Sequence, residues 1–377
     1  MYDAEIRSSD EAAKGARNWD APTIGTGFWM TPYNPKYWKK GDNGATGTGQ
    51  YQVSAEQMIP NKKRLDAEEK YLQAVSSVDA ERKKASLNQL VAEAKKSYYQ
   101  WMIVKKKLSI LDQDEKLLNF MIQSAEIRYK NGLGKINAYY KVKAAIGNIQ
   151  RMRLMLENEI KQQRIILNTL MSRDKLFQFD VDTLYAVKNY STTLFDSTVF
   201  INSRSDIKAI EKNIAINYLQ QNAEFAKLKP EFGVRYEHMF GFGGLPMQYT
   251  LLGTVKIPLT KWSSRSAKAN VESLKWKSES LSQQKQMIVN EATGMAYGMQ
   301  NDIEVKKKQI KLFDENIIPA LRKNFQTMQL AYEQNTEELF SLFDAWETLN
   351  TTQLEYLGQL QDLLMMQIAL EKILEIK

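Results

Sequence analysis

The chain has 377 residues, of which 43% are apolar and 25% charged, with a formal net charge of +8, one histidine and no cysteine. Without cysteine it forms no disulfide and no thiolate metal site, and no run of 18 apolar residues could cross a bilayer as a helix. This excludes only a helical membrane protein, because mean hydropathy hides the alternating strands of a membrane β-barrel.

Residues 2–17 are helix-like and begin directly after Met1. No basic segment followed by an apolar run opens the chain, so we expect that an export signal, if the protein has one, has been removed or lies upstream. The lysine runs at 105–107 and 306–308 fall in helical sequence. They indicate solvated helix faces, so no nucleic-acid partner is expected.

A first β-hairpin is predicted between Pro22 and Pro60, since apolar residues recur at every second position. The apolar positions are Ile24, Thr26, Phe28, Met30, Tyr51, Val53, Ala55 and Ile59. The opposite positions are polar or glycine and include Glu56. Each strand has about 9 to 11 residues, which is enough for a tilted strand to cross a bilayer.

The loop of this hairpin is rich in aromatic residues. Trp29, Tyr33, Tyr37 and Trp38 lie near two prolines, ahead of a glycine-rich stretch at 39–48. Tryptophan and tyrosine are enriched where a membrane protein meets the lipid headgroups. We therefore expect these four residues to form an aromatic belt.

A very long helix follows at 62–129, which at 1.5 Å per residue would reach about 100 Å if continuous. We expect breaks at Asp112–Asp114 and, in the second half, at Pro319. Heptad spacing predicts a packed seam of Trp101, Val104, Leu108, Leu111, Leu118, Ile122, Ala125 and Tyr129. The chain then turns at 131–135 into another helix.

The second half repeats this order after a connecting segment at 171–205. Its hairpin lies between Pro230 and Pro258, with apolar positions at Phe232, Val234, Tyr236, His238, Phe240, Tyr249, Leu251, Gly253, Val255 and Ile257. Arg235, Glu237 and Lys256 take the opposite positions, and with Glu56 they are expected to face a barrel lumen. A turn at 334–338 precedes a second seam, from Leu339 to Leu374.

Two copies of one unit explain this order. Aligning Tyr129 with Tyr332 also aligns Gln150 with Gln353. The predicted parts are a first repeat at 1–170, a connecting segment at 171–205 and a second repeat at 206–377. Four strands cannot close a barrel, and an open sheet cannot present unpaired edges to lipid, so the chain is expected to oligomerise.

Three motifs, in this order along the chain, resemble the TolC-type outer-membrane efflux ducts. They are Gln57-Met58-Ile59-Pro60 at the end of a hairpin, the run from Arg128 to Leu133 before a heptad helix, and the run from Ser203 to Ile207. The resemblance implies an α+β membrane protein: a homotrimer with a 12-stranded outer-membrane barrel and a long α-helical barrel in the periplasm of a diderm bacterium. It also implies a periplasmic adaptor and an inner-membrane pump as partners. The hairpin ending is similar to the heavy-metal efflux branch.

The resemblance also implies functional positions. The two turns, with Asn131, Gly132, Leu133, Gly134, Asn335 and Thr336, are expected to form a periplasmic tip that docks the adaptor. Ala138 and Ser341 stand where the family commonly has an acidic residue, and they are candidates to narrow the pore. Asn335 replaces the second turn glycine, and Ser205 replaces the proline usual at the opening of the second half.

No catalytic, cofactor or metal site is expected. His238 lies among the apolar positions of a strand, and the glycine-rich stretches lie between strands with no helix following, unlike phosphate-binding loops. The leading hypothesis is a passive export duct that its partners open. The alternative is a coiled-coil scaffold of the envelope without a pore, and the exported substrate stays open.

Overall fold

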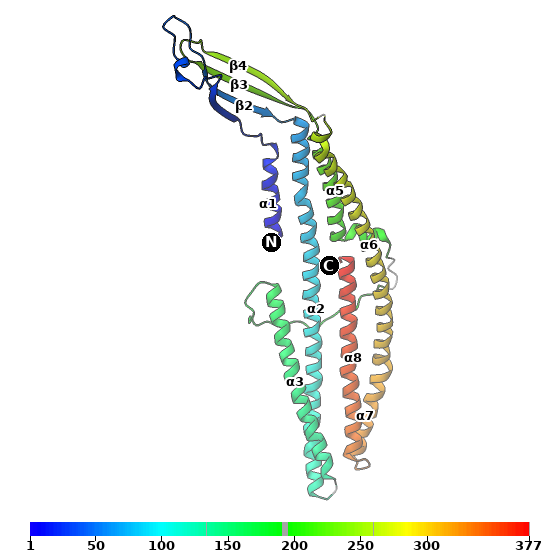
Figure 1. Cartoon of the computed structure of the whole chain (residues 1–377). Helices are drawn as coiled ribbons and strands as arrows, with labels where there is room; N and C mark the ends of the chain where they lie inside the picture. The colour runs from blue at the N-terminus through cyan, green and yellow to red at the C-terminus, as the bar shows by residue number, and fades with distance from the viewer. Residues whose placement is uncertain (133, 191–194, 259, 377) are drawn as a thin grey trace. The chain divides into compact units, whose positions relative to one another are not determined.

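A computed structural model describes residues 1–132, 134–190, 195–258 and 260–376 (Figure 1). The chain divides into two compact units. Unit 1 holds Met1–Lys83 and Ser205–Ile288, and unit 2 holds Lys84–Arg204 and Val289–Lys377. Each unit therefore draws on both of the predicted repeats.

Helices make up most of the described chain. They are α1 (Tyr2–Lys14), α2 (Lys62–Lys130), α3 (Ile136–Leu170), α4 (Ser197–Ser203), α5 (Ser205–Ala226), α6 (Lys261–Leu312), α7 (Ile318–Glu333) and α8 (Leu339–Leu374). Short 3-10 helices lie at Gly15–Arg17 and Pro35–Trp38, and a π-helix lies at Phe313–Ile317. Among the residues described, no helix combines the length and apolar character needed to cross a membrane.

Unit 1 contains an antiparallel sheet in the order β1-β2-β3-β4. The strands are β1 (Thr23–Trp29), β2 (Gln50–Ile59), β3 (Glu231–Gly241) and β4 (Gln248–Lys256). A central row across the sheet consists of Ile24, Ala55, Tyr236 and Leu251, each opposite the next. All four are apolar in the sequence pattern, so the two predicted hairpins and their matching faces are confirmed.

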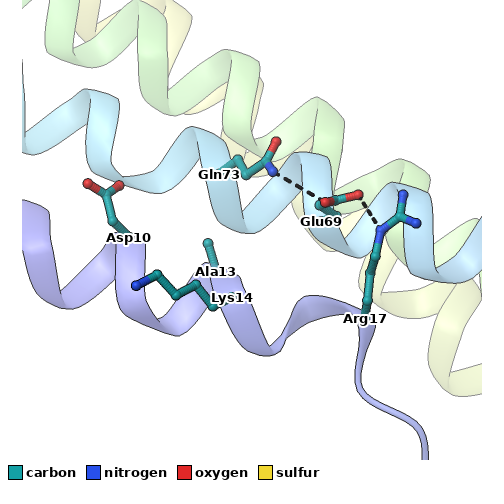
Figure 2. Close-up of a pocket in the computed structure, with 6 residues that line it drawn as sticks. All are labelled: Asp10, Ala13, Lys14, Arg17, Glu69 and Gln73. Atoms are coloured by element: carbon teal, nitrogen blue, oxygen red, sulfur yellow. Dashed lines mark hydrogen bonds and ion pairs between the residues drawn. The ribbon is translucent and has the colours of Figure 1, made fainter.

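The helices of unit 1 follow the same order as the strands. Arg17, just after α1, donates from Nε to Glu69 of α2 at 2.7 Å, as Figure 2 shows. Val78 of α2 packs with Ile216 of α5. Lys285 of α6 lies 3.2 Å from a carboxylate oxygen on α5. The order is therefore α1, α2, α5, α6.

Unit 2 is held by the two predicted seams. Residues of both seams are buried in one apolar cluster that includes Val104, Leu111, Leu118, Ala125, Leu339, Leu342 and Trp346. Helix α3 joins the same cluster, and its Arg153 lies 2.6 Å from Asp112 and 2.7 Å from Glu115 of α2. The heptad positions thus form the core, as predicted, although Tyr129 is exposed.

The predicted break at Asp112–Asp114 is wrong, because α2 runs without interruption from Lys62 to Lys130. Asp114 faces the core, where its Oδ1 accepts a hydrogen bond of 2.8 Å from Trp346 Nε1. A polar residue interrupts an apolar stripe without removing a backbone hydrogen bond, so the helix continues.

The irregularity expected at Pro319 is present. Here α6 passes through the π-helix at Phe313–Ile317, and Pro319 occupies the first turn of α7. The backbone stays helical on both sides, and proline lacks the N–H that a helix interior uses, so an irregular turn beside it is expected.

Candidate functional site

The apolar face of the sheet in unit 1 is exposed. Ile24 in the central row has 73% of its surface exposed, and Leu251 has 65%. The other large exposed residues of the same face are Phe28, Tyr51, Val53, Phe232, Val234, Tyr236, Phe240, Tyr249 and Val255. Contiguous apolar patches of this extent are rare on proteins whose surface meets water, and they mark contact with lipid or a partner.

The opposite face is polar and partly buried. Glu237 is only 8% exposed, and one of its carboxylate oxygens lies 2.6 Å from Arg235 Nε. Glu56 lies opposite Arg235 in the neighbouring strand, and Lys256 Nζ is 3.7 Å from Glu231. The structure therefore gathers the four residues predicted to face a lumen on one face.

The two faces are inverted relative to a sheet that packs on an apolar core, where the apolar side chains are buried and the charged ones exposed. The sheet is also open. Strand β1 pairs only with β2, and β4 only with β3, so each outer strand presents a free edge in the described chain. Free edges of this kind are templates for pairing with another chain.

Aromatic residues of both hairpins cluster at the loop end of the sheet. Trp38 stacks on Phe242 with ring centroids 5.4 Å apart, and Phe28 lies 5.8 Å from Trp38. Tyr33 and Tyr37 are exposed. Trp29 follows Phe28 directly in β1, so it points to the polar face and does not join the cluster. Of the four predicted belt residues, Trp38 alone lies in the cluster.

The two helix turns lie together in unit 2. Arg128, near the end of α2, donates from Nη2 to the carbonyl of Tyr332 at 2.9 Å, and it also donates to Asn335 Oδ1. Its guanidinium lies over the Tyr332 ring, 4.1 Å from the centroid. Tyr332 is buried, and its hydroxyl is 2.6 Å from Ser124 Oγ. These contacts fix the second turn against the first.

Each turn has, among its described residues, one with positive φ. Gly132 has a φ of 72°, and Asn335 has a φ of 62° in the second turn. Asparagine tolerates this conformation better than most residues, which explains how it replaces a glycine. Asn131, Gly132, Gly134, Asn335 and Thr336 are exposed, whereas Leu133 lies outside the described residues.

The two candidates to narrow the pore occupy equivalent places. Ala138 is the third residue of α3, and Ser341 is the third residue of α8. Both are half-buried, and Ala138 packs against the apolar core of unit 2. A cleft of about 620 Å³ beside Ala138 is lined by residues in and next to both turns, among them Arg128, Gly132, Asn335 and Glu338.

Two buried carboxyl groups were not foreseen from the sequence. Burial raises the pKa of Asp114 to about 6, against the opposing effect of the hydrogen bond from Trp346. Burial also acts to raise the pKa of Glu371. Hydrogen bonds from Lys188, Lys95 and Tyr190 outweigh this effect, so the pKa of Glu371 is lowered.

Glu371 anchors the segment that joins the two halves. Its carboxylate lies 2.5 Å from Lys188 Nζ and 2.6 Å from Lys95 Nζ, and it accepts a bond of 3.0 Å from the hydroxyl of Tyr190. The segment around 188–190 is thereby held against α2 and α8. Nothing in the local sequence signals these partners, because they lie far apart along the chain.

Within the described ranges, no group of three or more histidine, aspartate or glutamate side chains could hold a metal ion. His238 lies within β3, and its ring centroid is 4.4 Å from that of Phe240. Both glycine-rich stretches lie between paired strands, as the sequence predicted.

Comparison with known proteins shows what the chain is similar to. Residues 2–173 match the family described as outer membrane efflux protein. No sequence among the curated proteins matches the chain. The solved outer-membrane channel OprN is 14% identical with a TM-score of 0.75, and the match covers 99% of this chain and 85% of that one.

Two further channels have the same fold. The outer membrane protein VceC of Vibrio cholerae is 13% identical with a TM-score of 0.74, covering 99% of this chain and 92% of that one. The CmeC outer membrane channel of Campylobacter jejuni is 9% identical with a TM-score of 0.74, covering 99% and 81%. The fold is that of the TolC-like outer-membrane channels. With the family match, this confirms the predicted resemblance to the TolC-type outer-membrane efflux ducts.

Proposed function

We propose that the chain is the outer-membrane channel of a tripartite efflux system, a passive exit duct that an adaptor and an inner-membrane pump open. The observation that carries this proposal is the inverted sheet of unit 1. Its exposed face is apolar, its partly buried face is charged, and both of its edges are free among the described residues. In a transmembrane barrel the apolar face meets lipid and the polar face meets water.

The duct is a homotrimer in this proposal. About eight strands are the fewest that close a barrel, and lipid does not tolerate unpaired strand edges. In three copies, β4 of each chain pairs with β1 of the next, which gives 12 strands and leaves no edge. The order of helix, hairpin, long helix, turn and helix occurs twice in each chain, consistent with a duplicated unit.

The charged face then lines the lumen, with Glu56, Arg235, Glu237 and Lys256 in contact with water. Both signs of charge are present, so the wall sets no strong preference for one sign of cargo. A duct that opens and closes without binding its cargo tightly needs no catalytic group or cofactor.

The paired turns of unit 2 form the surface that docks the adaptor. The exposed residues Asn131, Gly132, Gly134, Asn335 and Thr336 offer polar backbone and short side chains that a helical hairpin can approach closely. Arg128 and Tyr332 hold the two turns in one arrangement. Ala138 and Ser341, just inside each turn, narrow the pore.

Fractionation tests the proposal. After membranes of a diderm bacterium are washed with carbonate, the protein should stay with the outer membrane, and lysine cross-linking in mild detergent should give a ladder that ends at three chains. Release by carbonate, or a stable monomer with a folded sheet, would leave the scaffold without a pore as the better account.

A further inference from the structure

The exposed apolar face of the sheet ends where the strands meet the helices. On β2 its apolar positions run from Tyr51 to Ile59, which is about 27 Å of strand at about 3.4 Å per residue. A tilt of about 40° reduces this length to a height of about 21 Å, close to the apolar band of about 25 Å on membrane barrels. Ile59 and Ile257 are exposed and lie directly before Pro60 and Pro258. The boundary between lipid tails and headgroups therefore falls at these two residues.

Exposed basic residues follow this boundary at once. Lys62 and Lys63 open α2, and Lys261 and Arg265 lie in the first turns of α6. Within the described ranges, none of these four cationic groups has an ion pair or a hydrogen bond. Lys62 is three residues beyond Ile59, at most about 11 Å of chain. The four cations therefore lie at the level of the headgroups.

The nearby carboxylates do not neutralise these cations. Arg17 holds Asp66 at 2.9 Å and Glu69 at 2.7 Å. Asp20 and Glu68 have no ion pair among the described residues, and they are fewer than the four free cations. Neither α2 nor α6 has an acidic residue in its first turn. Because the start of a helix carries partial positive charge, basic residues there favour a bound anion.

The free cations of α2 and α6 lie on the side that continues the apolar face. Arg64 pairs with Glu231, which begins the charged face of β3. At 100° per residue, Lys62 lies about 160° around α2 from Arg64 and so points away from the charged face. On α6, Arg265 lies one turn after Trp262 and about 60° around the helix from it.

Two exposed tryptophans mark the same level at both edges of the sheet. Trp19 is 51% exposed and lies four residues before the start of β1, and Trp262 is 81% exposed and lies six residues after the end of β4. Figure 1 shows that the helices of unit 1 all meet the strands at this one end of the sheet. Tryptophan is enriched at the level of lipid headgroups, where its apolar ring and its N–H are both accommodated.

We infer that Lys62, Lys63, Lys261 and Arg265 form a basic collar that binds the headgroups of anionic phospholipids, with Trp262 beside them. The phosphates of these lipids supply the negative charge that the described chain lacks at this level, and long basic side chains reach headgroups readily. The inference rests on the proposed membrane barrel. It goes further by assigning the lipid class and the residues that bind it, in the leaflet next to the helices.

Native mass spectrometry of the purified trimer tests the lipid class. The protein in detergent is given equal amounts of phosphatidylglycerol and phosphatidylcholine with identical acyl chains, and the lipids retained on the trimer are counted. Wild-type trimers should retain several-fold more phosphatidylglycerol. In K62Q/K63Q/K261Q/R265Q the ratio should fall to about one. The matched control, K116Q/K308Q/R322Q/K323Q, removes the same charge from exposed sites in unit 2 and should keep the wild-type ratio.

A second measurement tests the position of the collar. The chain has no cysteine, so W262C and W276C can each be labelled at one site with a bimane fluorophore. In vesicles that contain phosphatidylcholine with a nitroxide on its headgroup, the label at 262 should be quenched. The label at 276 lies about 21 Å further along α6 and should stay bright.

The outcomes separate the collar from the proposed function. If trimers form and stay in the membrane, but the collar variant keeps the wild-type lipid ratio or the control loses it equally, the collar is wrong and the duct stands. If both labels are quenched alike, or neither is, the headgroups do not lie at this level and the collar is wrong as well. If the mass spectrum shows only monomers and carbonate releases the protein from membranes, both the collar and the proposed function fail.

Discussion

Leu251 and Thr250 are neighbours in β4 that face opposite sides of the sheet. Leu251 lies in the exposed central row, and Thr250 lies opposite Glu237 on the charged face. In a barrel, Leu251→Arg places a charge in lipid near the midplane and should destabilise folding by about 2 to 4 kcal/mol. Thr250→Arg faces water and should fold almost normally. Denaturant unfolding in lipid vesicles measures the difference, and equal losses for both variants would refute the assigned faces.

Asp114 gives the protein a pH-dependent stability term. Its pKa is raised to about 6 by burial, so the folded chain holds this proton between about pH 4 and pH 6 while the unfolded chain releases it. The contribution of Asp114 to stability therefore falls as pH rises through this window, by about 2 to 3 kcal/mol, and stays low above it.

Asp114→Asn should remove this loss, since an amide oxygen can still accept the bond from Trp346. The free energy of unfolding of the variant relative to the wild type should increase from pH 4 to pH 8. Circular dichroism of denaturant unfolding in detergent measures it. Asp112→Asn is the control, because Asp112 is an exposed partner of Arg153 and its loss should give no such gain. A pH-independent difference for Asp114→Asn would contradict the prediction.

At the scale of elements, the strands could be predicted because their pattern is local. Period two, counted from a bounding proline, separates the two faces of β1, β2, β3 and β4. The heptad positions of α2 and α8 were predictable for the same reason. In each case the sequence within one element carries the signal.

The features that the sequence did not predict depend on contacts between residues far apart along the chain. Asp114 appeared to end a helix, but its partner Trp346 lies 232 positions along the chain. The anchoring of the segment at 188–190 depends on Glu371 and Lys95 from two different helices.

The first turn of unit 2 gives a prediction at this scale. Proline fixes φ near −65°, whereas Gly132 has a φ of 72° and donates its N–H to Tyr129 at 3.0 Å. Gly132→Pro should therefore remodel the turn, leave trimers in the outer membrane, and abolish export through lost docking of the adaptor. Gly147→Ala, on an open face of α3, is the control and should export normally. Normal adaptor binding and export by Gly132→Pro would show that the tip is elsewhere.

At the scale of the whole molecule, the proposed duct needs more than one chain. In the described chain its sheet has free edges, and the apolar face of the sheet is exposed. In the proposed trimer, strands of neighbouring copies pair with the edges and lipid covers the apolar face. Folding of the barrel and assembly of the copies are then one event, so a change at any of these surfaces should reduce the amount of trimer.

The pore itself gives the last prediction. Ala138 and Ser341 occupy the same place in α3 and α8, so a trimer presents each of them three times just inside the tip. A larger side chain at either place should narrow the passage, and the two together should narrow it most. Ala138→Trp and Ser341→Trp should therefore lower the single-channel conductance of purified trimers in planar bilayers. Tyr140→Trp is the control, since this residue is already large and exposed on α3. If Ala138→Trp, Ser341→Trp and the double variant all conduct like the wild type while trimers remain intact, the narrowest part of the duct lies elsewhere along the helices.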